Sequence, residues 1–233
     1  MKKIVLIAIL TVAAYAQGVY ATFNVVPKKE ASLAFSTNGM VADVKVDIGS
    51  RVSKNQVLAI LENSDLKAYV AKARAALEFA KKSYNRALKA QDVQNRAIFD
   101  KFDFEYKNAK ASLALALANY NKSILKAPFG GIITAKAVEV GDVVSAMAPR
   151  MLFKIESNQK KLLLSFDEKY LNRVKIGDIF KYKLDGSNKV HSGKIVKIYP
   201  SVDSKNHTAK AEVEAGNLVS GLFGDGTIEL GDN

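Results

Sequence analysis

GMVADVKVDIGSRVSKNQVLAILE at residues 39–62 and GIITAKAVEVGDVVSAMAPRMLFKIE at residues 131–156 are two copies of one sequence pattern. Each copy has two glycines ten residues apart, and a valine follows the second glycine by three residues. The paired glycines are Gly39 and Gly49 in the first copy, and Gly131 and Gly141 in the second. A two-residue insertion near Pro149 is the only break in register. This self-similarity indicates a duplicated structural unit.

Apolar and polar residues alternate on both sides of the glycines in each copy, which is the pattern of short β-strands. Glycine tolerates the positive φ of a tight turn, so we expect all four glycines to lie in turns. One copy alone cannot bury its apolar face. The two copies are therefore predicted to pair with each other and close into a small β-sandwich.

The residues between the two copies have a different pattern, which is typical of helices. Residues 50–127 contain neither proline nor glycine, and apolar residues recur there at alternating spacings of three and four. A polar stretch at residues 91–96 interrupts the pattern, which predicts two helices in an antiparallel coiled-coil hairpin with a polar tip. The main seam positions are Leu66, Val70, Leu77, Tyr84, Phe102, Tyr106, Leu113 and Tyr120.

Residues 162–230 have the pattern of several short strands separated by turn signals such as Asp185-Gly186. Evenly spaced short strands of this kind favour a small β-barrel. The predicted fold class is therefore mixed α and β and elongated, with a β-sandwich split by an α-hairpin and followed by a barrel.

Composition removes several classes of chemistry. The 233 residues include no cysteine, which excludes disulfides and thiolate metal sites, and the two histidines, His191 and His207, have no second ligand at metal spacing. We expect no catalytic residue, no cofactor and no bound metal. The formal charge is +12, but the lysines are scattered, which favours a solvated basic surface over a nucleic-acid site.

The N-terminus has the pattern of a secretory signal. Two lysines precede the uncharged apolar run Ile4–Ala16, and Ala14 and Ala16 provide small residues before a cleavage point at Gln17. The run is shorter than a typical membrane-spanning helix. An uncleaved anchor remains the alternative, and both interpretations predict export of the remaining chain.

The stretches at residues 39–58, 125–134, 140–144 and 192–203 together resemble the periplasmic adaptor, or membrane fusion protein, family of tripartite efflux pumps, in a short form of the type that serves resistance-nodulation-division transporters. The resemblance implies that the sandwich is lipoyl-like. The domains expected on this basis are a signal peptide at 1–16, an extended N-terminal segment at 17–34, lipoyl-like halves at 35–63 and 125–157, an α-helical hairpin at 64–124 and a β-barrel at 158–233.

The resemblance also implies a function without catalysis. The chain is expected to be a periplasmic adaptor, with possible contact to the inner membrane, that bridges an inner-membrane transporter and an outer-membrane channel. It is also expected to self-associate into a ring or funnel. The barrel, with the segment 23–35, is expected to face the transporter, and the hairpin tip to contact the channel. The tip residues assigned to that contact are Arg86, Leu88, Asp92, Gln94 and Asn95.

Two alternatives stay open from the sequence. An adaptor of an ABC-type export or secretion system would have the same outline. A lipoyl or biotinyl carrier would share the half-motifs, but a carrier has a tight turn where this chain has about sixty helical residues. The transported substrate and the ring stoichiometry have no signature in the sequence.

Overall fold

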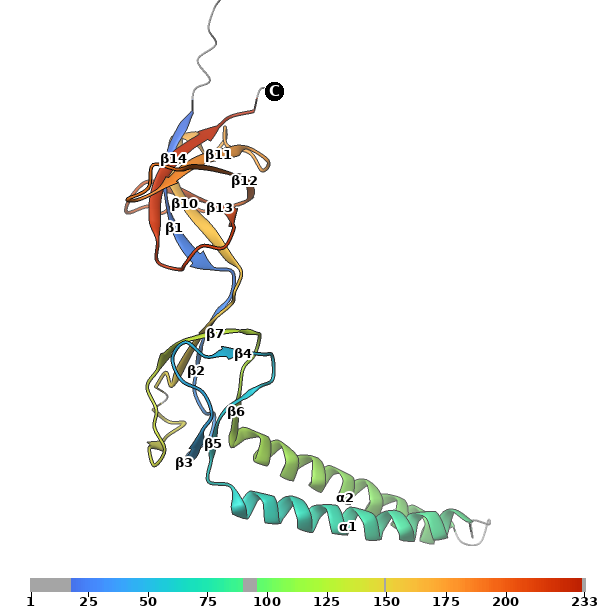
Figure 1. Ribbon diagram of the computed structural model, residues 1–233. Helices are drawn as coiled ribbons and strands as arrows, with labels where there is room; N and C mark the ends of the chain where they lie inside the picture. Colours follow the sequence, from blue (N-terminus) through green and yellow to red (C-terminus); the bar gives the residue numbers. More distant parts are fainter. Residues whose placement is uncertain (1–17, 90–95, 149, 232–233) are drawn as a thin grey trace, which may run out of the picture. The chain divides into compact units, whose positions relative to one another are not determined.

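The computed structural model describes residues 18–89, 96–148 and 150–231, and the chain divides into two compact units (Figure 1). One unit lies within residues 1–28 and 159–233, and the other spans residues 29–158. The predicted signal peptide at 1–16 lies outside the described residues.

The first unit is a closed antiparallel β-barrel, built from one strand near the start of the described chain and five strands from its last part. Blue β1 lies in it beside orange and red strands in Figure 1. Its strands, in the order in which they pair around the barrel, are β1 (Val19–Pro27), β10 (Lys160–Asp167), β13 (Thr208–Ala215), β12 (Val190–Ile198), β11 (Ile179–Leu184) and β14 (Phe223–Glu229). A short 3-10 helix, η2 (Glu168–Tyr170), follows β10.

The barrel core follows from strict alternation along its strands. In β1 every second residue from Val19 to Val25 is buried. Phe23 packs edge-on against Phe180, with ring centroids 5.8 Å apart. Gly226 in β14 leaves room for this cluster, because a Cβ atom there would come within 2.9 Å of the Phe180 ring.

The structure differs from the sequence prediction at residues 17–34, which were expected to form a separate extended segment. β1 instead pairs with both β10 and β14 and closes the barrel. The next strand, β2 (Glu30–Leu33), pairs with β9 of the other unit's sandwich. The reason is that edge strands leave backbone donors and acceptors unpaired, and these two strands supply the missing partners.

The second unit contains the sandwich and the hairpin. The sandwich has two four-stranded antiparallel sheets, with the orders β2-β9-β7-β4 and β6-β5-β3-β8. The remaining strands are β3 (Gly39–Val44), β4 (Arg51–Val52), β5 (Val57–Leu61), β6 (Ile124–Lys126), β7 (Gly131–Lys136), β8 (Val143–Val144) and β9 (Phe153–Glu156).

The two sequence copies exchange strands. β8 of the second copy pairs with β3, and β4 of the first copy pairs with β7. Equivalent backbone bonds repeat in both places: the N–H of Val41 donates to the carbonyl of Asp142 over 2.8 Å, and the N–H of Ile133 to that of Ser50 over 3.0 Å. The predicted closure of the sandwich by mutual pairing of the two halves is confirmed.

The four repeat glycines have two different roles. Gly49 and Gly141 lie in turns at φ +84° and +95°, as expected. Gly39 and Gly131 do not lie in turns and begin strands β3 and β7, which corrects the prediction for these two. A side chain at Gly131 would overlap the carbonyl of Glu156, so steric exclusion is the reason for glycine there.

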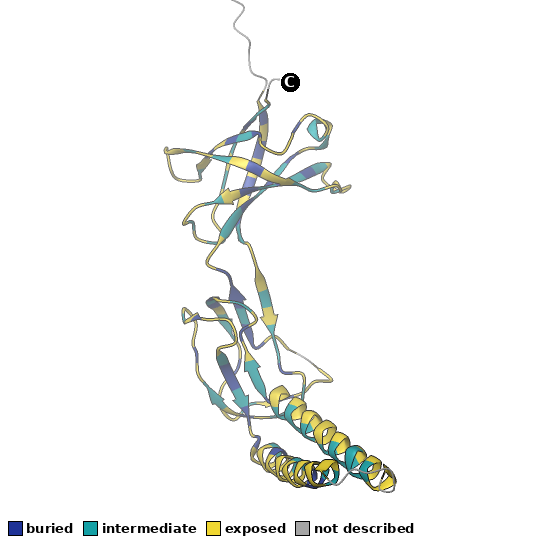
Figure 2. Ribbon diagram, turned by 90° about the vertical axis from the view of Figure 1, so that its right-hand side faces the viewer, coloured by how far each residue is buried: buried dark blue, intermediate teal, exposed yellow. Residues whose placement is uncertain are grey.

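The hairpin consists of α1 (Ser64–Lys89) and α2 (Arg96–Lys122). At 1.5 Å per residue, each helix is about 40 Å long. Figure 2 shows the outward faces of both helices as exposed and the facing sides as more buried. Among the described residues, no helix is long and apolar enough to cross a membrane.

Candidate functional site: the helical hairpin

A buried polar pair joins the two helices at their root, between the residue before α1 and the residue after α2. The side-chain amide of Asn63 donates to the hydroxyl of Ser123 over 2.9 Å, and that hydroxyl donates to the backbone carbonyl of Tyr120 over 2.6 Å. Asn63 and Ser123 are 3% and 1% exposed. Hydrogen-bonded polar groups in a buried position are directional, so this pair sets the point at which both helices leave the sandwich.

The eight predicted seam positions are all at least partly buried. Val70 is buried and the other seven are partly buried. Towards the tip the packing is aromatic, with the Tyr84 ring 5.2 Å from that of Tyr106 and 5.6 Å from that of Phe99. Ser83 is also buried, which the heptad pattern did not indicate, and it accepts a hydrogen bond from Arg86 over 3.2 Å.

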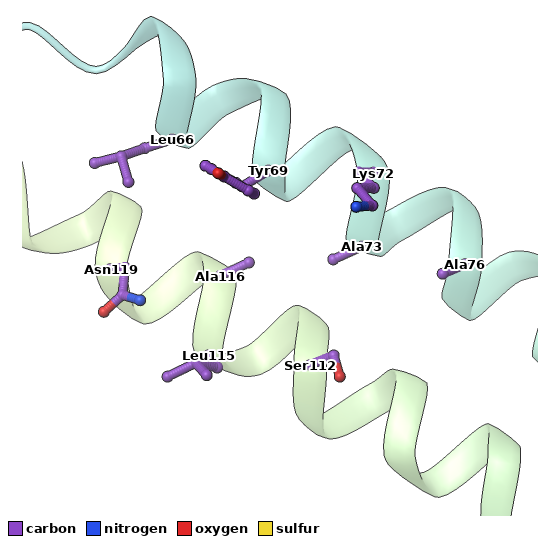
Figure 3. Close-up of a pocket in the computed structure, with 9 residues that line it drawn as sticks. All are labelled: Leu66, Tyr69, Lys72, Ala73, Ala76, Ser112, Leu115, Ala116 and Asn119. Atoms are coloured by element: carbon purple, nitrogen blue, oxygen red, sulfur yellow. The ribbon is translucent and has the colours of Figure 1, made fainter.

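One face of the hairpin has an apolar groove of about 490 Å³ near the root, drawn in Figure 3. Tyr69 and Leu115 flank it, one from each helix, and they remain 61% and 65% exposed. The residues that line the groove are Leu66, Tyr69, Lys72, Ala73, Ala76, Ser112, Leu115, Ala116 and Asn119. The seam pattern does not indicate this groove, although large apolar residues outside the seam, such as Tyr69 and Leu115, are a usable signal for it.

Of the five predicted tip residues, the structure describes two. Arg86 and Leu88 lie in the last turns of α1 and are both exposed. Asp92, Gln94 and Asn95 lie outside the described residues.

Ion pairs along the exposed sides of the helices follow the helical spacing. Lys82 lies 2.8 Å from Glu78, and Lys107 lies 2.6 Å from Asp103. The hydrogen bond from Lys82 lowers the pKa of Glu78, and the hydrogen bond to Asp103 raises the pKa of Lys107. Glu78 and Lys107 therefore stay charged near neutral pH.

The barrel contains its own polar cluster. Glu212 accepts hydrogen bonds from Lys161 and from the Tyr199 hydroxyl, both over 2.6 Å. Burial raises the pKa of Glu212, but these hydrogen bonds and the charge of Lys161 outweigh it and hold the pKa below its usual value. Glu212 thereby stays ionised and connects β13 with Lys161 in β10 and with Tyr199, the residue that follows β12.

The two histidines both lie in the barrel. His191 stacks on the Tyr182 ring at 5.4 Å, and His207 lies 3.0 Å from Glu168. Within the described part of the chain, no three His, Cys, Asp or Glu side chains are grouped so that they could hold a metal ion.

Comparison with known proteins identifies the family. Residues 29–155 match the family described as "CzcB-like, barrel-sandwich hybrid domain". The chain is 27% identical over 197 residues to the cobalt-zinc-cadmium resistance protein CzcB of Cupriavidus metallidurans, a match that covers 77% of this chain and 38% of that protein. The chain thus spans less than half the length of this curated relative.

Solved structures share the fold. A MacA–MexA chimera that contains the Pseudomonas aeruginosa MexA α-hairpin domain has a TM-score of 0.79 at 19% identity, covering 93% of this chain and 80% of that one. The membrane fusion protein Spr0693 of Streptococcus pneumoniae R6 has a TM-score of 0.73 at 19% identity, covering 92% and 100%. With more than half of its length matched by the family pattern, the chain belongs to the periplasmic adaptor, or membrane fusion protein, family and carries its CzcB-like barrel-sandwich hybrid domain.

Proposed function

We propose that this chain is the periplasmic adaptor of a tripartite efflux pump, bridging an inner-membrane transporter of the resistance-nodulation-division type and an outer-membrane channel. The observation that carries the proposal is the topology: a two-helix hairpin inserted between the halves of a sandwich. Members of the family are adaptors rather than enzymes, and the relative CzcB is named as a resistance protein.

In this proposal each part has one task. The hairpin reaches the channel through its tip, where Arg86 and Leu88 are exposed. The barrel contacts the transporter. Copies of the chain associate side by side around a conduit, and residues 1–16 direct export. The work is done by interfaces and rigid geometry, since a seam packed by aromatic rings resists bending.

The direct test is site-specific photocrosslinking in cells, with one photoreactive residue at Leu88 and another at Ser187 in the barrel. We expect Leu88 to capture an outer-membrane channel and Ser187 an inner-membrane transporter, both identified by mass spectrometry. An ABC-type transporter at Ser187 would change the pump class and leave the bridging role intact.

The matched control is a photoreactive residue at Asn108, at mid-height on α2. The bridging function is wrong if neither Leu88 nor Ser187 captures a membrane protein. The assignment of the channel contact to the tip is wrong if Asn108 captures the same channel as efficiently as Leu88 does.

A further inference from the structure

The segment between β10 and β11 covers one end of the barrel and finishes in a tight turn. Val174 is 3% exposed and belongs to the barrel core. Beyond it, the N–H of Asp178 donates to the carbonyl of Lys175 over 3.2 Å, and Gly177 has a φ of +102°. Ile176 therefore occupies the first of the two central positions of the turn, where it is 68% exposed.

A buried carboxylate fixes this turn to the barrel. Asp178 is 8% exposed, and its side chain accepts a hydrogen bond from the N–H of Lys175 over 2.8 Å. The same side chain accepts one from the N–H of Gly231 over 3.3 Å, and the N–H of Gly177 donates to the carbonyl of Ile195 in β12 over 2.9 Å. The turn is thus held in one conformation before any partner arrives, which lowers the entropy cost of binding.

The segment that carries the turn is basic. Residues 169–177 contain three basic residues, Lys169, Arg173 and Lys175, and no acidic residue. Asp167 lies 2.8 Å from Lys169 and pairs with it. Arg173 and Lys175 are both exposed. The turn therefore presents an exposed aliphatic side chain together with two cations.

The place of the turn in the fold points to a membrane. Val19 pairs with Ile228, which pairs with Phe180, so the start of β1, the end of β14 and the start of β11 lie at one end of the barrel (Figure 1). The apolar run Ile4–Ala16 stops two residues before Gly18, a stretch of at most about 7 Å. A retained run would hold this end of the barrel against the bilayer. The chain passes to the sandwich at the opposite end.

We infer that the turn docks on an anionic lipid surface, that of the inner membrane, with Ile176 among the headgroups and Arg173 and Lys175 against the lipid phosphates. Anionic headgroups attract basic residues beside a membrane, and an apolar side chain gains free energy when it leaves water for the interface. Such a lipid contact goes beyond the proposed function, in which the barrel contacts a transporter, and either can fail without the other.

The experiment uses fluorescence, because the chain contains no tryptophan and one introduced residue reports its own surroundings. The test variant is Ile176→Trp. The matched control is Val219→Trp, since Val219 is 70% exposed in the loop before β14, at the opposite end of the barrel. Both full-length variants are mixed with vesicles of phosphatidylethanolamine and phosphatidylglycerol, or of phosphatidylcholine alone, and lipids with brominated acyl chains serve as quenchers. Any membrane binding by residues 1–17 is common to both variants.

We expect the emission of the Ile176→Trp variant to move to shorter wavelength and to be quenched by the anionic vesicles, with little change on phosphatidylcholine. The Val219→Trp variant should respond to neither. Added to Ile176→Trp, Lys175→Gln should raise the lipid concentration needed for half of the shift about five-fold, and Arg173→Gln/Lys175→Gln about twenty-five-fold, since each basic residue near an anionic surface strengthens binding about five-fold. Lys183→Gln/Lys189→Gln, which removes the same charge near the opposite end, should have no effect.

Three results would overturn the lipid contact. The first is an emission at position 176 that neither kind of vesicle changes, in variants whose thermal unfolding matches that of the wild type. The second is an equal response at position 219, which would mean adsorption without a defined site. The third is a response at position 176 that depends neither on lipid charge nor on Arg173 and Lys175.

A protein partner would give a different pattern. A photoreactive residue at position 176 that captures a transporter in cells, together with no response to vesicles, would assign the turn to that protein and contradict the lipid contact. A vesicle response without any membrane protein captured from Leu88 or Ser187 would leave the lipid contact in place and remove the bridging function.

Discussion

Gly131 illustrates how a single residue constrains the sandwich. Its position at the start of β7 places the backbone directly against the carbonyl of Glu156 in β9, with no space for a Cβ atom. Glycine at this position therefore allows two strands to approach, which is a different requirement from the positive φ at Gly141.

Gly131→Ala is expected to destabilise the sandwich by about 1–3 kcal/mol, because the added methyl group has to displace backbone. Denaturant unfolding would measure the loss. Gly216→Ala is the control, since a Cβ atom there meets no neighbour within 4 Å. Equal stability of the two variants would contradict the close approach.

Glu212 makes barrel stability depend on pH. Its folded-state pKa lies below the usual value of 4.5, so its contribution is present above pH 4.5 and is lost as pH falls through the folded-state pKa. We expect Glu212→Gln to lower the free energy of unfolding by about 1–2 kcal/mol at pH 7. The difference from the wild type should shrink in acid, and a difference independent of pH would rule out the ionised carboxylate as its cause.

At the scale of elements, the function proposed for the hairpin depends on two features: straight helices, and the hydrogen-bonded pair of Asn63 and Ser123 at the root. Nothing in its described length interrupts either helix, and the predicted seam positions run from Leu66 to Tyr84 in α1 and from Phe102 to Tyr120 in α2. Val70 and Ala80 of α1 are buried, whereas no residue of α2 is fully buried, so the hairpin is thinly packed. Local breaks should therefore have large effects.

Leu77→Pro or Leu113→Pro should abolish transport while leaving export of the chain intact. Proline inside a helix costs about 3 kcal/mol and kinks it, so the tip is redirected. A cellular efflux assay and an immunoblot of the periplasmic fraction would measure the two effects. Leu77→Met is the conservative control, and normal efflux by the proline variants would contradict the proposal that a straight rod is needed.

Ser123→Ala is expected to destabilise the second unit by about 1–3 kcal/mol, because it leaves the Asn63 amide buried without its acceptor. Asn63→Ala in the same chain should recover part of the loss, since no donor is then left unpaired. Thermal unfolding of the single and double variants would measure this coupling. Ser112→Ala on the exposed face is the control, and strictly additive losses would show that the two side chains do not act as a pair.

At the scale of the whole molecule, the described residues form two separate hydrophobic cores. One comprises fifteen buried residues of the barrel and the other fourteen of the sandwich, and the two sets have no member in common. The chain passes from the barrel to the sandwich after β1 and returns before β10. Units with independent cores are expected to unfold independently.

Phe180→Ala should therefore destabilise the barrel by about 3–5 kcal/mol and leave the sandwich unchanged, whereas Leu58→Ala should do the reverse by about 2–5 kcal/mol. Hydrogen exchange resolved along the sequence would distinguish them. Equal loss of protection in both units from either variant would mean that the chain unfolds as one cooperative body.

Much of the fold was predictable because the relevant information is local and periodic. The matched positions of Gly49 and Gly141 in the two copies indicated the duplicated turns. The recurrence of apolar residues between Leu66 and Tyr120 indicated the helices and their seam. The helical stretch without proline or glycine between the two copies, broken by one polar segment, indicated an inserted hairpin. Patterns of this kind can be recognised in a sequence because a helix or strand repeats the same backbone geometry from residue to residue, so that side chains on one face recur at a fixed spacing.

Other features depend on residues that meet only after folding. β1 closes the barrel by pairing with strands about 140 and 200 residues further along, and no periodicity reports such a partner. Gly131 is constrained by a carbonyl on another strand, and the apolar groove forms only where Tyr69 and Leu115 flank two packed helices. The sequence by itself determined the elements and their duplication, and the tertiary structure decided the strand partners and the exposed surfaces, because both depend on contacts between distant residues.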